Sequence, residues 1–393
     1  MSLPASFLAA AGYTTPPLWR ILTKSGYFMG LSGAIGATLT YAAAVRPTLR
    51  SGVGGSGDTE VLRRRAARYL AWSGVVLLVA GYFQLAARVA RAGHGTAFDS
   101  ALTPTRIWTF LRTPAKPGTW VAQGTLTLVQ NLVLVATAVV LISLFTARVG
   151  RRLDTVALIA LPLSLATTLI SAIPTAAFAD LDDLLDTLLV QAHIISGTVW
   201  VGGLALLVAL ATTRRALSGD AGVLWADLWR RFGLVALICV GAVTISGLWL
   251  TWKAVGTLPQ LWTTTYGLFL LVKIALVLGL ITAGGFNQFW LMPRIAHARR
   301  ADATSSLLHL TLRHFPRVVW VEAALGLAVL GILPFLTGSA RTEAAPDSPA
   351  PTATAGILAL GLLLVLTLAA SLYATAKVSD TLARRPVLRS RGI

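Results

Sequence analysis

Four aspartates precede a single histidine inside one apolar stretch of an otherwise basic sequence. The aspartates are Asp180, Asp182, Asp183 and Asp186, and the histidine is His193. At 3.6 residues per helical turn, Asp183, Asp186 and His193 share one stripe of a helix, which continues to Trp200. Carboxylates attract cations, and a neutral imidazole suits copper, zinc and iron. The spacing therefore predicts a cation entrance at the aspartates that leads to a metal ligand at His193. The structural alternative is an aspartate-rich helix N-terminus, favoured by the helix dipole, followed by a hydrogen-bonded buried histidine.

Three further polar residues, Lys273, Asn287 and Glu322, lie within apolar stretches. Ionisable groups are costly there and are functional candidates by default. We expect Lys273 at a depth similar to that of His193, where its ammonium could pair with Asp186, bind an anionic group or extend to the membrane surface. Asn287 and Glu322 could form a hydrogen-bonded pair that joins two helices, or line the inner end of an ion pathway.

Soft metal ligands are scarce. The methionines are Met1, Met29 and Met292, and the one cysteine is Cys239. Met29 could approach His193 as a further metal ligand, although lone Met and Cys residues usually serve packing. The sequence has no P-loop, no HExxH and no Ser-His-Asp arrangement, so we expect neither ATP-driven nor hydrolytic chemistry and do not expect an enzyme.

The elements that must position these residues are membrane-spanning helices. Hydrophobic residues make up 55% of the 393 residues and charged residues 12%, whereas soluble domains carry about a quarter charged residues. About 20 apolar residues cross a bilayer as a helix. The apolar runs predict an all-α transmembrane bundle of about nine spans, at 24–45, 69–89, 120–146, 155–177, 186–211, 232–252, 265–290, 318–336 and 355–376. The first span is rich in Gly and Ala, which indicates a closely packed, buried helix. A short interfacial helix is expected around 107–111.

The basic residues predict the orientation. Of the 33 Lys and Arg residues, 23 lie in the loops after the odd-numbered spans or in the C-terminal tail. By the positive-inside rule, we expect the N-terminus outside and the C-terminus in the cytoplasm. The net charge of +18 is explained by these helix ends and by anionic lipid rather than by nucleic acid.

The predicted organisation has four parts. Residues 1–186 hold spans 1–4, residues 187–336 hold spans 5–8, residues 337–354 are an external linker rich in Pro and Ala, and residues 355–393 hold a peripheral ninth span and a basic tail. The linker composition gives it no means of forming a core.

Several motifs of spans 5–8 resemble those of the copper resistance D (CopD) family of bacterial inner-membrane proteins. The run from His193 through Trp200 to Gly203 resembles the His-x6-Trp-x-Gly-Gly element of that family. The segments RRFGLVAL, SGLWLTW, TTTYGLFLLVKIALVLGLITAGGFNQFWLMPR and RVVWVEAALGLAVLGILPFL follow in the family's order. The resemblance covers about 187–336 and places His193, Lys273, Asn287 and Glu322 at family-type positions.

The resemblance implies copper transport or copper tolerance, often beside a separate periplasmic copper-binding protein of the CopC type. The scarcity of methionine departs from a Met-rich relay, and His and Asp would suit Cu(II) better than Cu(I). The same His-x6-Trp element with a later lysine also resembles haem proteins of the HemJ type. A haem-binding redox protein, with haem b held by His193, is therefore one alternative, and a partner in copper-enzyme assembly is another.

Overall fold

The computed structural model describes residues 15–52, 55–93, 97–146, 148, 151–178, 180–218, 221–286 and 315–384. These residues form helices and connecting loops, without strands. The α-helices are α1 (Leu18–Leu31), α2 (Ala37–Thr40), α3 (Arg46–Arg50), α4 (Ser56–Ala92), α5 (Phe98–Ala101), α6 (Pro104–Leu111), α7 (Gln123–Ile142), α9 (Leu153–Leu169), α10 (Leu181–Ala211), α11 (Ala221–Ala254), α12 (Gln260–Thr263), α13 (Thr265–Phe286), α16 (Phe315–Ile332), α17 (Ala340–Ala344) and α18 (Ala355–Arg384).

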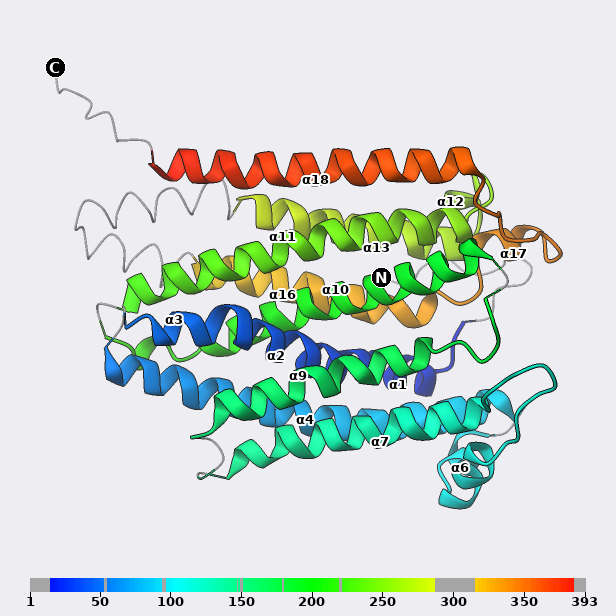
Figure 1. Ribbon diagram of the computed structural model, residues 1–393, viewed down its shortest axis with the longest axis horizontal. Coiled ribbons are helices and arrows are strands. Elements are labelled where there is room, and N and C mark those ends of the chain that lie inside the picture. Colours follow the sequence, from blue (N-terminus) through cyan, green and yellow to red (C-terminus); the bar gives the residue numbers. More distant parts are fainter. Residues whose placement is uncertain are drawn as a thin grey trace.

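The long helices run side by side along the longest axis of the molecule, as a membrane bundle does (Figure 1). Within the described ranges, eight helical segments are long and apolar enough to cross a membrane, and a ninth apolar helix, Val319–Phe335, is shorter. The prediction of an all-α bundle with about nine spans is therefore confirmed. The orientation of the termini stays a prediction.

The first span is an unusual helix. Two π-helical segments, Ser32–Gly36 and Tyr41–Val45, interrupt the helix between Leu18 and Arg50. A π segment inserts an extra residue into the α-helical pattern and often marks a functional site. Within an apolar stretch of 18 residues in this span, 72% of the residues are buried. This confirms the expectation of a buried helix.

Glycines account for the close contact of the first span with α10. A Cβ atom added to Gly202 would lie 2.6 Å from the carbonyl carbon of Ser32 and 2.9 Å from Cα of Gly36. Because ordinary van der Waals contact begins at 3.4 Å, the two backbones touch with no room for a methyl group. Small residues permit this approach in lipid, where packing rather than hydrophobicity holds helices together.

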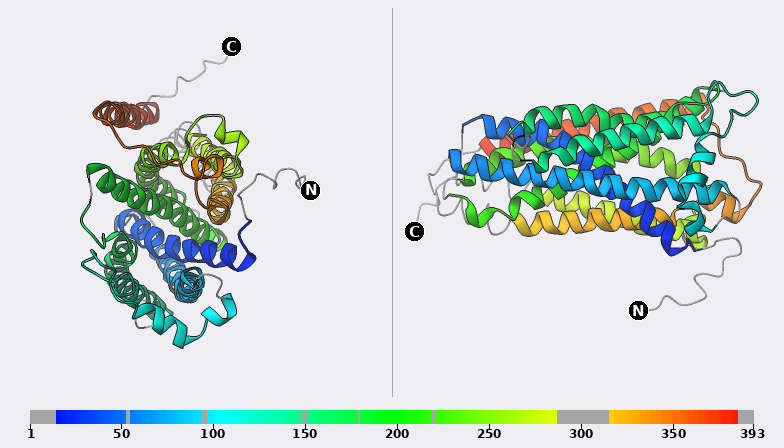
Figure 2. Two further views of the ribbon diagram at one scale, coloured as in Figure 1. Left: turned by 90° about the vertical axis from the view of Figure 1, so that its right-hand side faces the viewer. Right: turned by 90° about the horizontal axis from the view of Figure 1, so that it is seen from below.

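The C-terminal helix lies at the edge of the bundle, as expected. Figure 2 shows α18 set apart from the other helices when the molecule is seen end-on. None of the residues in its 18-residue apolar stretch is buried inside the molecule. The helix contacts α11, where a Cβ added to Gly241 would lie 2.7 Å from the Leu372 side chain of α18. The helix therefore rests on one face of α11 and leaves most of its surface to lipid.

Short helices gather at one end of the bundle. The predicted interfacial helix is present as α6, and the linker at 337–354 contains the helix α17. The side chain of Ser339 begins α17 by accepting a hydrogen bond from the Thr342 N–H at 3.1 Å. Glu343 then accepts hydrogen bonds from the Thr265 and Tyr266 N–H groups at 2.7 and 2.9 Å, so the linker caps the N-terminus of α13.

The opposite end of the bundle carries arginines that share one aspartate, Asp154. Asp154 accepts a hydrogen bond from Tyr41 at 2.5 Å and forms ion pairs with Arg50 at 2.7 Å, Arg63 at 3.5 Å and Arg46 at 3.6 Å. These contacts join α3, α4 and α9 where the apolar helices end.

Candidate functional site

Helices α10 and α11 are joined by three polar contacts that follow one another along their interface. From the α17 end inward, Asp182 forms an ion pair with Lys253, Asp186 accepts a hydrogen bond from the Trp249 indole at 3.0 Å, and His193 lies 3.0 Å from the Ser246 hydroxyl. The residue numbers rise on α10 as they fall on α11, which indicates antiparallel helices lying side by side (Figure 1). The seven residues from Asp186 to His193 span about 10 Å of helix. Asp186 and His193, two members of the predicted stripe, therefore face α11.

The hydrogen bonds of Ser246 decide which nitrogen of His193 carries the proton. The Ser246 hydroxyl donates its single proton to the Ala242 carbonyl at 2.5 Å, so its oxygen can only accept from His193 Nδ1–H. In the neutral ring, Nε2 then holds a lone pair. Gly247 leaves space for the ring, because a Cβ there would lie 3.5 Å from His193 Cε1.

Lys273 faces that lone pair. Its ammonium lies 3.4 Å from His193 Nε2 and can donate a hydrogen bond to it. The sequence predicted Lys273 at this depth, with Asp186, an anionic group or the membrane surface as its partner, but it did not predict the contact with His193. The nearby Lys24 ammonium interacts electrostatically with Lys273 and donates to the Leu333 carbonyl at 2.9 Å. The His193 Nε2 atom therefore faces the Lys273 ammonium, and a second ammonium, that of Lys24, lies near Lys273.

The four predicted aspartates have different surroundings. Asp180 caps α10, with its carboxylate 3.0 Å from the Asp183 N–H, which fits the structural alternative for this residue. Asp182 pairs with Lys253 and also accepts from the Ala353 N–H at 3.2 Å. Asp183 is exposed, and Asp186 is half-buried. Only the last two stay candidates for collecting a cation.

The remaining predicted residues are spread over the bundle. The Met29 side chain is 47% exposed on α1, whereas the hydrogen-bond partners of His193 come from α11 and α13. Trp200 and Glu322 are buried, at 6% and 3% exposure, and Trp200 belongs to the main apolar core. Asn287 lies outside the described residues, so its pairing with Glu322 stays a prediction. Cys239 is buried and forms no disulfide.

The described residues contain no group of three or more His, Cys, Asp or Glu side chains close enough to hold a metal ion together. His193 and Asp186 are separated by about two helical turns, which is too far apart for the two side chains to form one shared ligand set. The assignment of His193, Asp183, Asp186 and Met29 as metal ligands stays a prediction.

Ser246 and Trp249, the partners of His193 and Asp186, were not predicted from the sequence. Both belong to the segment Ser-Gly-Leu-Trp-Leu-Thr-Trp at 246–252. A polar serine and two tryptophans within an apolar span were the available signal, because such groups normally find a hydrogen-bond partner when buried.

This segment lies in a part of the chain that is similar to known proteins. Residues 226–336 match the family model described as copper resistance protein D. We refer to this matched range as the CopD region. The region contains Ser246, Trp249, Lys273 and Glu322, but begins after His193, so the resemblance expected for residues 187–225 stays a prediction.

One relative of the chain is the copper transport protein CutJ of Bacillus subtilis (strain 168). The two are 29% identical over 160 residues, which is 40% of this chain and 25% of that protein. The chain therefore spans about a quarter of the length of this relative. No solved structure matches the chain. The CopD region supplies every hydrogen-bond partner that the structure gives the His193 ring.

Proposed function

We propose that this protein handles copper as its cargo, in transport across the bacterial cytoplasmic membrane or in copper tolerance at it. The main support for this proposal is the position of His193. Its imidazole is half-buried inside a long apolar helix and is oriented by Ser246 of the CopD region. A hydrogen bond on one ring nitrogen fixes the other as the ligand and raises its basicity. The CopD description and the name of the Bacillus relative both point to copper.

The proposed route begins at Asp183 and Asp186. Asp183 is exposed, and Asp186 uses Oδ1 for Trp249, which leaves Oδ2 as a second acceptor. A cation attracted here would move along the interface of α10 and α11 to Nε2 of His193, and then toward the buried Glu322 on α16. A separate periplasmic copper-binding protein of the CopC type would deliver copper at the Asp183 end.

Lys273 competes with copper in this mechanism. A lone pair that accepts a hydrogen bond from an ammonium group cannot also coordinate a metal. Copper binding therefore requires the Lys273 ammonium to withdraw from His193 Nε2, and its return would help to release the ion. Nearby positive charge also opposes a cation. Lysine thus favours passage of copper over tight storage.

Elemental analysis of the detergent-purified protein tests the assignment. Wild type, His193→Ala, Lys273→Met and Cys239→Ala would each be loaded with copper, washed and analysed for copper and iron, with an absorption scan through the Soret region. We expect copper in wild type, loss in His193→Ala, tighter retention in Lys273→Met and no change in Cys239→Ala, the matched buried control.

Two results would overturn the proposal. Stoichiometric copper retained by His193→Ala would remove His193 as the ligand. Iron with a Soret band that disappears in His193→Ala would indicate a haem protein instead. The entrance is tested separately with the double variant Asp183→Asn/Asp186→Asn, for which we expect slower copper uptake; unchanged uptake would exclude the aspartates from the route.

A further inference from the structure

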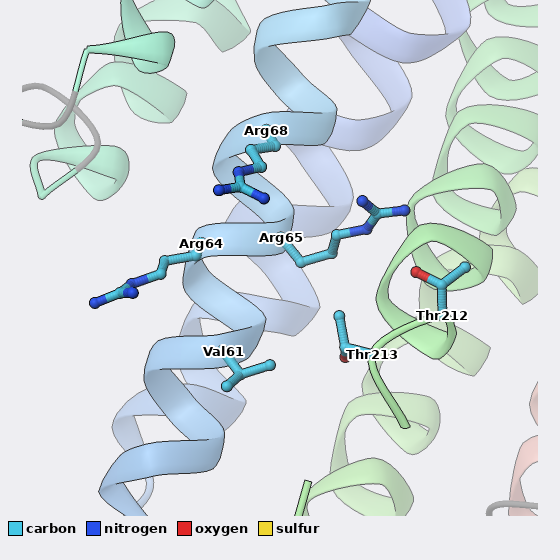
Figure 3. Close-up of a pocket in the computed structure, with 6 residues that line it drawn as sticks. All are labelled: Val61, Arg64, Arg65, Arg68, Thr212 and Thr213. Carbon is cyan, nitrogen blue, oxygen red and sulfur yellow. The ribbon is translucent and has the colours of Figure 1, made fainter. Parts of the chain in front are cut away.

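A basic cavity opens between α4 and the end of α10, at the end of the bundle opposite α17. Its volume is about 400 Å³, and its lining residues are Val61, Arg64, Arg65, Arg68, Thr212 and Thr213 (Figure 3). Three arginines come from α4, where Arg64 and Arg65 are adjacent and Arg68 lies about one turn further on, and the lining includes no carboxylate. This composition suits an anion with several acceptor oxygens.

The cavity lies at the depth of lipid headgroups. The apolar run of α4 begins at Tyr69, directly after Arg68, and the apolar run of α10 ends at Ala211, directly before Thr212. A hydrocarbon core about 30 Å thick ends where such apolar runs end, and phosphate groups lie just beyond it. The positive-inside rule assigns this end to the cytoplasmic leaflet.

The arginines of the cavity are only partly balanced. Arg65 donates through Nε to the Ala209 carbonyl at 3.0 Å, and Arg64 forms an i,i+4 ion pair with Glu60 in which both side chains are more than half exposed. Exposed pairs of this kind hold their partners weakly. Arg68 has no hydrogen-bond or ion-pair partner among the side chains that the structure describes.

The other carboxylates described at this end are occupied elsewhere. Asp58 accepts from Ser218 N–H and hydroxyl at 2.8 and 2.5 Å. Asp154 pairs with the arginines of α3 and with Arg63, and Asp227 pairs with Arg230 and Arg231 at 2.9 and 2.8 Å. None of them is available to balance Arg65 and Arg68.

We propose that this cavity binds the phosphate headgroup of an anionic phospholipid. A free phosphate offers the same oxygens, but an apolar surface next to the arginines favours a lipid. Trp72 lies one turn beyond Arg68 on α4, is 60% exposed and packs edge-on against Phe145, with ring centroids 5.4 Å apart. Aromatic rings at this level mark the membrane interface, and acyl chains can lie against them.

Native mass spectrometry of the full-length protein in detergent tests this site. Delipidated protein would be titrated with phosphatidylglycerol and, separately, with zwitterionic phosphatidylcholine. The test variant is Arg64→Gln/Arg68→Gln, which keeps Arg65 and its hydrogen bond to α10. The control is Arg151→Gln/Arg152→Gln, which removes the same charge from two exposed arginines at the same end of the bundle.

We expect wild type and the control to bind one phosphatidylglycerol in preference to phosphatidylcholine. The test variant should bind it about 10- to 30-fold more weakly, given the attraction of each arginine for an anionic leaflet. Equal weakening in both variants, or equal binding of both lipids, would overturn the site. Displacement of the lipid by millimolar inorganic phosphate would overturn the lipid assignment in favour of a free phosphate. Because no copper is present, the outcome is independent of the proposed function.

Discussion

The contact between Gly202 and the first span allows a sharp test of how the bundle is held together. In Gly202→Ala, the new methyl carbon would lie 2.6 Å from the Ser32 carbonyl carbon, against 3.4 Å for ordinary contact. The Ser32 carbonyl oxygen would be closer still, so the backbones would have to separate by more than about 0.8 Å. A gap of 0.5–1 Å already forfeits about a quarter to a half of each van der Waals contact across it. Because overpacking typically costs about 1–3 kcal/mol, we expect a loss of about 2 kcal/mol in the free energy of unfolding.

Gly197 provides the matched control on the same helix. A Cβ there would meet nothing within 4 Å, so Gly197→Ala should leave the free energy of unfolding unchanged or raise it by up to about 1 kcal/mol through helix propensity. Reversible unfolding of both variants with SDS in mixed micelles, followed by tryptophan fluorescence, measures the difference. If Gly202→Ala is as stable as Gly197→Ala, close backbone packing does not hold α10 to the first span, and the reasoning is refuted.

Three further predictions follow from single polar contacts. Ser246→Ala removes the acceptor that orients His193 Nδ1–H, so copper retention should weaken about tenfold with folding intact. Equilibrium dialysis against a copper chelator measures the retention, and unchanged retention would show that Ser246 does not position His193 for copper. Glu343→Ala removes both hydrogen bonds to the N-terminus of α13 and should lower the free energy of unfolding by about 1–2 kcal/mol, measured in the same mixed micelles; equal stability would show that water replaces the cap. Asp154→Asn leaves three arginines without their shared anion, and we expect a loss of about 2 kcal/mol; a stability unchanged at low salt would contradict this role.

The apolar runs predicted the helices because crossing a bilayer imposes length and composition on each span. His193 and Asp186 were placed on one helical face for the same local reason, since their spacing fixes their direction within a regular helix. Their partners were not predicted. Ser246 and Trp249 lie 53 and 63 positions further along the chain, and the face that α11 turns to α10 depends on packing between helices, which one sequence does not encode as a visible pattern.

Met29 illustrates a second limit. Its approach to His193 was predicted only from its place in the outer half of the first span. Depth along a span does not fix which face of the helix a side chain occupies, because that face depends on packing between helices. The side chain of Met29 is exposed, and its contact with His193 stays a prediction.

The glycine contact between α10 and the first span also has a mechanical consequence. From Ser196 to Ala211 nearly every residue of α10 is buried, whereas none before Ser196 is. Side chains that interlock resist sliding, but at Gly36 and Gly202 backbone lies directly on backbone with nothing interlocked. Packed helices move past one another by small shear displacements. We expect this smooth contact to let α10 as a whole shift by a small distance along the first span without losing the close packing between the two helices.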